Sequence, residues 1–553
     1  MTKLQLSAIF IFLSLITEGY GQNRPPKYWI GFTDKLNTPY SVSTPEDFLS
    51  PRSLERRSKQ GITITKQDLP VDPAYVDSLR ALGLSIINIS KWMNGVIVQS
   101  SDTLLMDTLN KISFVKAPPV IIEPGQKVMV IPLINKFPLC NHKASIDYGS
   151  SDTQVKMIYG EYLHLNGYQG KGMLIAILDA GFDNADSISS LKNIYNNHQV
   201  IVTRDFVKDG TPFYKTYKHG TSIFSIIGGY LKNTMYGTAI DASFALIRTE
   251  NVPSEYVIEE YNWVCGAEFA DSLGADIISS SLGYSQFDDP SQDHTYQDMD
   301  GKTTVASIGA DIAFSKGMVV VNSAGNQGNK PWQKITAPSD AFNVITVGAV
   351  DADGTIMNFS SRGPSYDGRV KPDVCALGNA TVSQSPDGSI KGCTGTSCST
   401  PLISGMTACL WQANPDATNM QVVKAIRQSA LQFTHPDSDY GYGIANFEYA
   451  DHLLKDIVKT DDAKIDQVTV YPNPTNNSFT LEVLRPSDNI SQQTAFISFY
   501  DMMGRKLHDE SRTLTGQLNQ LSFENTGWLS SGVCLVRVVI ASRSFTLHLL
   551  KIR

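Results

Sequence analysis

Short, continuous apolar runs recur through the middle of the chain, and each is followed by polar or glycine residues. Runs of this kind fit strands that are buried on both faces, as in a parallel sheet. The runs are Met173–Leu178, Phe244–Ile247, Asp276–Ser279, Met318–Val321 and Val344–Val347. Helices are predicted between them, at about Gly220–Leu231, Val257–Leu273 and Val305–Lys316. This alternation predicts an α/β domain with a doubly wound, mostly parallel sheet.

Polar residues collect where the predicted strands end. Asp179 follows the first strand directly, Ser281-Leu282-Gly283 follows another, and Ser323-Ala324-Gly325-Asn326 follows a third. Ligands bind outside the carboxyl ends of the strands in sheets of this type. A functional site is therefore expected at this edge.

The patterns on either side of this segment differ from it. Mixed strand-like and helix-like stretches before it predict a compact α+β unit, and short alternating stretches after it predict a small β-sandwich. The predicted divisions are 1–21 signal peptide, 22–124 α+β unit, 125–153 connector and processing region, 154–455 α/β domain, 456–466 linker and 467–553 β-sandwich.

Composition and charge narrow the functional classes. The 553 residues are too many for one domain, and 42% of them are apolar, which suffices for several cores. A net charge of -8 argues against a nucleic-acid partner, which calls for a basic surface. No stretch reaches the roughly 18 apolar residues that span a bilayer.

The N-terminus has the layout of a signal peptide. Lys3 precedes an apolar run, Leu4–Ile16, and Gly19-Tyr20-Gly21 offers small residues for signal peptidase, so Gln22 is expected to begin the exported chain. A buried strand is the alternative interpretation.

Export allows disulfides among the seven cysteines. Their number is odd and their spacing fits no metal motif, so no framework is predicted. Cys375 with Cys393 is a possible pair. Cys398 is either a reactive thiol at a helix N-terminus or a buried packing residue.

The segment Gly395–Pro401 precedes an apolar stretch, Leu402–Trp411, that is long enough for a helix. Proline suits the first turn of a helix, so Ser397 is predicted at a helix N-terminus, where free N–H groups gather. Such a site can stabilise the oxyanion that forms when a serine attacks a carbonyl. The alternative is that this segment is only a helix cap.

A nucleophilic serine needs a base and an orienting group. His219 lies between a loop and an apolar helix, beside a glycine, and Asp179 ends a buried strand where an unpaired carboxylate would be unfavourable. The chain order of the three residues is Asp, His, Ser, which is the order of the subtilisin type of triad.

Together these motifs resemble the subtilisin-like serine proteases, or subtilases, over roughly Tyr168–Asn446. The motifs, in order, are Ile175–Gly181, His219-Gly220-Thr221, Ser323-Ala324-Gly325-Asn326, Phe359–Pro364 with Lys371-Pro372-Asp373-Val374, and Gly395-Thr396-Ser397 with Thr400-Pro401.

The resemblance implies a role for each site residue. Ser397 is the nucleophile, His219 the general base and acid, and Asp179 the group that orients the imidazole. The Asn326 amide and the Ser397 N–H form the oxyanion hole. Residues that pair with an extended substrate and wall its first pocket are Ser281, Leu282, Gly283, Ser323, Ala324 and Gly325.

Two positions depart from the family pattern. Ser222 stands where a histidine often follows His-Gly-Thr, and Cys398-Ser399 replaces the usual Met-Ala after the serine. No metal site or cofactor is expected. The acidic loop Asp288–Asp300 is either a calcium site or a solvated loop, and its irregular spacing favours the loop.

The flanking units also resemble known domains. Residues 22–124 occupy the place of a subtilase propeptide, an inhibitory α+β chaperone. The C-terminal unit resembles the sorting domain of the type IX secretion system of Bacteroidota, on the cues Tyr471–Pro474, Asp501–Arg505 and Ser531–Val538. Cys534 stands where that pattern usually has tyrosine, and a carbohydrate-binding sandwich is the alternative.

The sequence therefore predicts an exported serine endopeptidase that is made as a zymogen and matures by self-cleavage between about Gly125 and Thr153. Protein or peptide substrates and the secretion machinery are its expected partners, a monomer its expected state, and the cell exterior or outer surface its location. The alternative function is that of a non-catalytic adhesin or scaffold that retains the protease fold.

Overall fold

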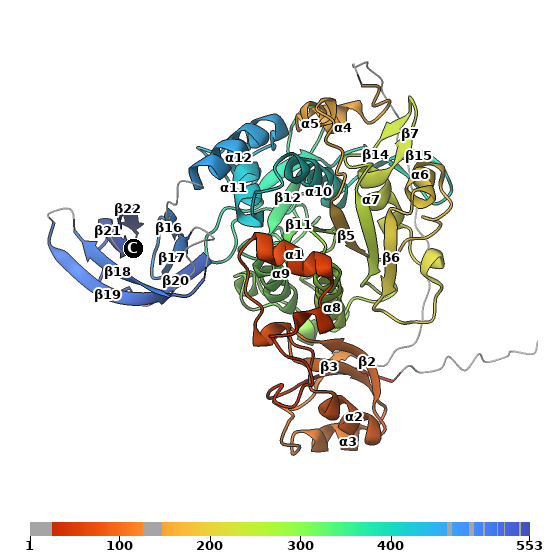
Figure 1. Cartoon of the computed structure of the whole chain (residues 1–553), viewed down its shortest axis with the longest axis horizontal. Coiled ribbons are helices and arrows are strands. Elements are labelled where there is room, and N and C mark those ends of the chain that lie inside the picture. The colour runs from red at the N-terminus through yellow and green to blue at the C-terminus, as the bar shows by residue number, and fades with distance from the viewer. Residues whose placement is uncertain are drawn as a thin grey trace, which may run out of the picture.

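The structure, a computed structural model, describes residues 25–124, 146–461, 467–485, 492–501, 504–516, 518–524, 526–540 and 543–552. The predicted signal peptide, residues 125–145 of the connector and residues 462–466 of the linker lie outside the described residues. Figure 1 shows an N-terminal unit in red and orange, a large central domain, and a C-terminal unit in blue.

The centre of the molecule is a seven-stranded parallel sheet with the order β13-β12-β11-β10-β5-β9-β6. Its strands are β5 (Leu174–Asp179), β6 (Val200–Asp205), β9 (Ser243–Arg248), β10 (Ile277–Ser280), β11 (Val319–Ser323), β12 (Ile345–Val350) and β13 (Val374–Leu377). The predicted doubly wound α/β fold is confirmed. Two strands of this sheet were not predicted, and both are its edge strands: β6, which is half-exposed, and β13, which has 4 residues.

Helices cover both faces of this sheet (Figure 1). One face carries α7 (His219–Gly228), α10 (Thr396–Ala413), α11 (Asn419–Ser429) and α12 (Phe447–Asp461), and the other carries α8 (Ile258–Leu273) and α9 (Val305–Ser315). Along β5, Ile175 and Ile177 enter one core, and Leu174, Ala176 and Leu178 enter the other. This division explains why the strand is continuously apolar.

Smaller elements complete the central domain. They are α4 (Asp152–Lys156), α5 (Gly160–Leu165), α6 (Lys192–Asn196), β7 (Tyr230–Leu231), β8 (Met235–Tyr236), β14 (Thr381–Gln384) and β15 (Ile390–Cys393). Helix α12 continues to Asp461, so the first part of the predicted linker, 456–466, is helical. No helix in the described part of the chain is both long and apolar enough to cross a bilayer.

The N-terminal unit is an antiparallel sheet with the order β2-β3-β1-β4, packed against two helices. Its elements are β1 (Lys27–Gly31), α1 (Pro51–Lys59), α2 (Pro73–Ala81), β2 (Ser85–Ser90), β3 (Gly95–Gln99), α3 (Thr103–Leu109) and β4 (Val120–Glu123). Ile97 and Ile122 of this sheet pack against Tyr256 and Ile258 of the central domain. The α+β unit is therefore docked on the central domain.

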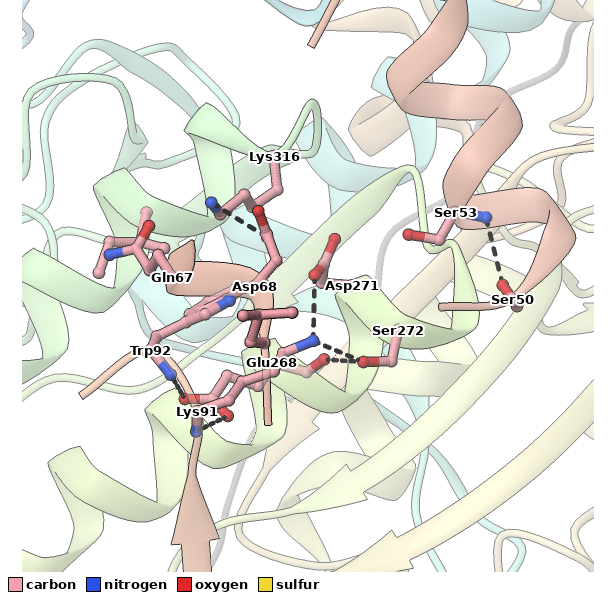
Figure 2. Close-up of polar contacts among 12 residues, drawn as sticks. Ser50, Ser53, Gln67, Asp68, Lys91, Trp92, Glu268, Asp271, Ser272 and Lys316 are labelled. Carbon is pink, nitrogen blue, oxygen red and sulfur yellow. Dashed lines mark hydrogen bonds and ion pairs between the residues drawn. The ribbon is translucent and has the colours of Figure 1, made fainter. Parts of the chain in front are cut away.

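A buried network of charges fastens α1 to α8. Arg57 of α1 donates to both oxygens of Asp271 at 2.9 and 2.8 Å, and to Asp68 Oδ1 at 3.0 Å. Figure 2 shows Asp68 facing Lys316 of the central domain, and Lys91 reaching toward Asp271. Burial alone would raise the pKa of Asp271, but the charges of Arg57 and Arg56 outweigh it and hold that pKa below its usual value. Each domain thus neutralises buried charges of the other.

The C-terminal unit is a sandwich of two antiparallel sheets, β16-β17-β20 and β19-β18-β21-β22. Its strands are β16 (Gln467–Tyr471), β17 (Phe479–Leu484), β18 (Gln493–Tyr500), β19 (Lys506–Leu514), β20 (Leu518–Phe523), β21 (Gly532–Ile540) and β22 (Arg543–Lys551). Cys534 lies in its core at 2% exposure. The predicted β-sandwich is confirmed.

Replacing Asp271 with asparagine should loosen α1, because Arg56 would lose its buried ion-pair partner and Arg57 would retain only Asp68. Removing one partner of a buried ion pair costs about 3–5 kcal/mol. Amide hydrogen exchange in α1 should therefore become at least about 10²-fold faster. The matched control is Asp77→Asn, because the Arg80–Asp77 pair is 56% and 68% exposed and should contribute little. Equal protection of α1 in both variants would contradict the importance of this network.

Candidate active site

Asp179 is the last residue of β5 and is fully buried. Its Oδ1 accepts hydrogen bonds from the Ala180 N–H at 2.7 Å and from His219 Nδ1 at 2.8 Å. Its Oδ2 is buried and has no hydrogen-bond partner in the described part of the chain. A buried carboxylate is strongly destabilised unless it is paired, so the imidazole is its essential partner.

His219 is the first residue of α7, and its side chain is 30% exposed. Gly220 allows the helix to begin this close to β5, because a Cβ at that position would lie 2.5 Å from Gly181 O and 3.0 Å from Asp179 Cβ. Burial alone would lower the pKa of His219, but the charge and hydrogen bond of Asp179, with Glu250 behind it, raise that pKa above the usual 6.5. Since Nδ1 is bound to Asp179, Nε2 is left to face a substrate.

Ser397 is the second residue of α10 and lies two positions after the N-cap Gly395, whose φ of 146° favours glycine. Its backbone N–H therefore has no acceptor within the helix. Thr396 between them is buried, and its N–H and hydroxyl both donate to Asn326 Oδ1, at 2.9 and 3.1 Å. These bonds turn the exposed amide of Asn326, with its NH₂ free to donate, toward the start of the helix.

The predicted substrate edges lie beside the same helix start. The Ser281 hydroxyl donates to Ser397 O at 3.0 Å, and the Ser323 hydroxyl donates to Leu282 O at 3.2 Å. Gly325 N–H donates to the Thr396 hydroxyl at 3.2 Å. The ends of β10 and β11 are thus joined to each other and to α10.

The structure assembles the predicted site residues in two groups. Asp179 and His219 are hydrogen-bonded, and Asn326 and Ser281 are tied to the Thr396–Ser397 segment. The two groups meet where α7 and α10 pack side by side. Among the described residues no hydrogen bond joins His219 to the Ser397 hydroxyl. The role of each residue remains a prediction.

The predicted pairing of Cys375 with Cys393 is wrong. Cys393, at the end of β15, forms a disulfide with Cys398, with a Cα–Cα distance of 5.9 Å. Cys375 is a buried free thiol on β13 that points to Tyr440 O at 3.5 Å. Cys398 is therefore not a reactive thiol; it is buried in the core, as the packing interpretation expects, and it also carries the disulfide. The disulfide was missed because spacing alone does not reveal which cysteines meet.

The acidic loop Asp288–Asp300 uses its carboxylates to stabilise its own turns. Asp289 accepts from Ser291 N–H at 3.0 Å, Asp298 from Thr295 N–H at 2.7 Å, and Asp300 from Lys302 N–H at 2.7 Å. The choice between a calcium site and a solvated loop stays a prediction.

Comparison with known proteins agrees with this architecture. Residues 170–443 match the Subtilase family, residues 27–129 match the peptidase S8 propeptide domain of Bacteroidota, and residues 469–551 match a secretion system C-terminal sorting domain. Subtilisin of Bacillus pumilus is 28% identical over 309 residues, which are 55% of this chain and 98% of that protein. Serine protease AprX of Bacillus subtilis (strain 168) is 29% identical over 329 residues, covering 54% of this chain and 70% of AprX.

The fold is also that of a solved structure, the epidermin leader peptide processing serine protease EpiP from Staphylococcus aureus. The TM-score is 0.52 at 15% identity, over 78% of this chain and 98% of that chain. Fold and matches together define a serine protease. The chain belongs to the subtilase family, peptidase family S8, with a propeptide before the protease domain and a type IX sorting domain after it. It is a secreted protease made as a zymogen.

The Cys393–Cys398 disulfide should help to position the nucleophile, because it fixes the residue directly after Ser397, whose hydroxyl lies 3.9 Å from Cys398 Sγ. Replacing both cysteines with serine should lower kcat on a peptide amide by about 10- to 100-fold, since small misplacements in an active site have effects of this size. The KM should change little. The control is dithiothreitol, which should slow the parent and leave the double variant unchanged. A double variant with parental kcat would contradict this role.

Proposed function

We propose that the protein is a secreted serine endopeptidase that cleaves peptide bonds through an acyl-enzyme, with Asp179, His219 and Ser397 as its triad. The observation that carries the proposal is the 2.8 Å bond between the buried Asp179 and His219 Nδ1, at the sheet edge where Ser397 opens α10. This bond fixes the tautomer in which Nε2 is free to accept a proton.

Acylation follows from these positions. Ser397 Oγ attacks the carbonyl carbon of the substrate while His219 Nε2 takes the hydroxyl proton, and an Oγ–C bond forms. The imidazolium is stabilised by the Asp179 carboxylate. The tetrahedral intermediate then collapses, its C–N bond breaks, and His219 returns the proton to the leaving amine. Water repeats the sequence in the second half, with His219 as its base, and releases the acid.

The developing oxyanion needs donors that are oriented before the reaction. The Ser397 N–H and the Asn326 NH₂ are suited to this role, because the first has no helical acceptor and the second is aimed by the Thr396 bonds. Removing one such donor in this family costs about 10²–10³-fold in turnover. The site therefore stabilises the transition state with groups that need no rearrangement.

Substrate binding is expected along Ser281–Gly283 and Ser323–Gly325. Backbone pairing to an extended peptide depends little on its side chains, so proteins and peptides in general are the expected substrates. The docked N-terminal unit keeps the precursor inactive, and the mature enzyme is expected to act as a monomer. No triad residue is replaced, so the alternative of a non-catalytic scaffold has no supporting observation.

Ser397→Ala should abolish hydrolysis of unfolded protein, because no other group occupies the nucleophile position at the start of α10. Ser399→Ala is the matched control. Its hydroxyl is buried and donates to Thr396 O at 2.9 Å, so this variant should retain most activity. The measurement is release of peptides from a denatured protein. Full activity of Ser397→Ala, or loss only in Ser399→Ala, would reject the assignment.

The acid limb of kcat/KM should lie above pH 6.5, because His219 must be neutral to accept a proton and its pKa is raised. Removing the negative charge in Asp179→Asn lowers that pKa, so the limb should move to lower pH, and kcat should fall by about 10⁴-fold. The measurement is a pH–rate profile of both proteins on one peptide substrate. A limb that does not move in Asp179→Asn would show that another group titrates.

Cleavage between about Gly125 and Thr153 should accompany maturation and should depend on Ser397. N-terminal sequencing of the mature protein should find a start within this segment, while Ser397→Ala should remain a full precursor. A mature chain beginning at Gln22, or normal processing of Ser397→Ala, would rule out self-cleavage there.

A further inference from the structure

Three glutamates converge beside the proposed catalytic centre without belonging to it. Glu250 lies two residues after β9, Glu255 in the following loop, and Glu259 in the first turn of α8. One carboxylate oxygen of each lies within 4.8 Å of the others. Glu250 and Glu259 are buried at 7% and 2% exposure, and Glu255 is partly exposed, so the cluster is deep and open on one side.

The cluster contains an oxygen with no partner. Glu259 Oε1 accepts the Asn251 N–H at 2.7 Å, but Oε2 is buried with no hydrogen-bond partner in the described part of the chain. The next residue provides a contrast: Glu260 pairs with His294 Nε2 and accepts the Ala306 N–H at 2.9 Å. A buried polar atom without a partner is costly, so the free oxygen of Glu259 calls for a ligand.

Charge points to the kind of ligand. No salt bridge reaches Glu250, Glu255 or Glu259 from any residue that the structure describes. Tyr284 and Thr249 donate hydroxyl bonds to Glu250 Oε1 at 2.7 and 2.9 Å, but neither supplies a positive charge. Burial raises the pKa of all three carboxyls, and the charge of Glu250 further raises the pKa of Glu255 and of Glu259. A bound cation would offset both the cost of burying the carboxylates and the repulsion between their charges.

We infer that Glu250, Glu255 and Glu259 form a binding site for a divalent cation of the calcium class. Ca²⁺ takes oxygen ligands at about 2.3–2.6 Å, so two ligands on opposite sides of the ion lie about 4.6–5.2 Å apart. Three carboxylate oxygens within 4.8 Å of one another can share such an ion, with water completing its coordination on the side open at Glu255. Secretion exposes the protein to surroundings where weak Ca²⁺ sites of about 10⁻⁴–10⁻³ M can fill.

The proposed cation site would join the segment after β9, which is bonded to Asp179, to the first turn of α8. Glu250 follows Thr249, whose N–H donates to Asp179 O at 3.1 Å, and Glu259 lies in the first turn of α8, which packs on the N-terminal unit. A bound cation would therefore hold the loop 251–257 between the catalytic edge and α8. This site is distinct from the acidic loop Asp288–Asp300.

Metal binding is best tested on the full chain carrying Ser397→Ala, which cannot digest itself. Calorimetry should find one Ca²⁺ per chain at this site, and Tb³⁺ should show luminescence excited through tyrosine, since Tyr284 contacts Glu250. Adding Glu255→Gln and Glu259→Gln should abolish both signals. The control pair, Glu55→Gln with Glu448→Gln, changes the same charge at exposed positions and should leave both signals intact.

Thermal unfolding with and without Ca²⁺ distinguishes glutamates that bind a metal ion from glutamates that only support the fold. Ca²⁺ at roughly 10 to 100 times its Kd should raise the Tm of the parent by about 3–10 °C and leave the Glu255→Gln/Glu259→Gln variant unchanged. In EDTA the variant should be at least as stable as the parent, because glutamine removes the repulsion. Absence of Ca²⁺ and Tb³⁺ binding in the parent would overturn the inference. So would equal Ca²⁺ stabilisation of both proteins, or a preference for substrates with basic side chains that depends on these glutamates without metal.

Discussion

The pairing of Asp179 with His219 is the constraint on which the site depends. Asp179, at the end of a central strand, is fully buried, and in the described part of the chain its side-chain partner is an imidazole at the start of a helix. The pair requires α7 to begin almost against β5, which only glycine at position 220 permits. The parallel strand order β11-β10-β5 brings Ser281 and Ser323 to the same edge of the sheet as Asp179. The order of the central strands, the start of α7 and the Asp179–His219 pair therefore depend on one another.

The second organising feature is the docking of the N-terminal unit. Its contact with α8 combines an apolar patch around Tyr256 with a buried network in which Arg57 joins Asp68 of its own unit to Asp271 of the central domain. An intact buried ion pair adds little net stability, because desolvation offsets most of the attraction between its charges. Separation of the units would leave charges on both sides without partners. The same helix, α8, begins at the glutamate cluster, so propeptide, proposed cation and catalytic edge share one element.

Much of the fold and of the candidate site was predictable from the sequence, and the elements and contacts that were missed have physical reasons. Runs such as Met173–Leu178 predicted strands correctly. Both faces of the sheet are covered by helices, so these strands are continuously apolar and do not alternate with polar residues. Strand β19 was missed because its residues are polar and mostly exposed, and β6 because it is an edge strand. The order of Asp179, His219 and Ser397 indicated the site, since the motifs are local. Contacts set by the local path of the backbone were not predictable: Cys393 pairs with Cys398 rather than Cys375, and the glutamates at 250, 255 and 259 follow no regular spacing.

Covalent labelling tests the central assignment most directly. The mature protein would be treated with a serine-directed fluorophosphonate, digested and mapped by mass spectrometry. A hydroxyl activated by His219 and Asp179 should carry the label on Ser397 alone, and His219→Ala should remove it although Ser397 is still present. Label on Ser399 or another serine, or equal labelling of Ser397 after the loss of His219, would contradict the proposed triad.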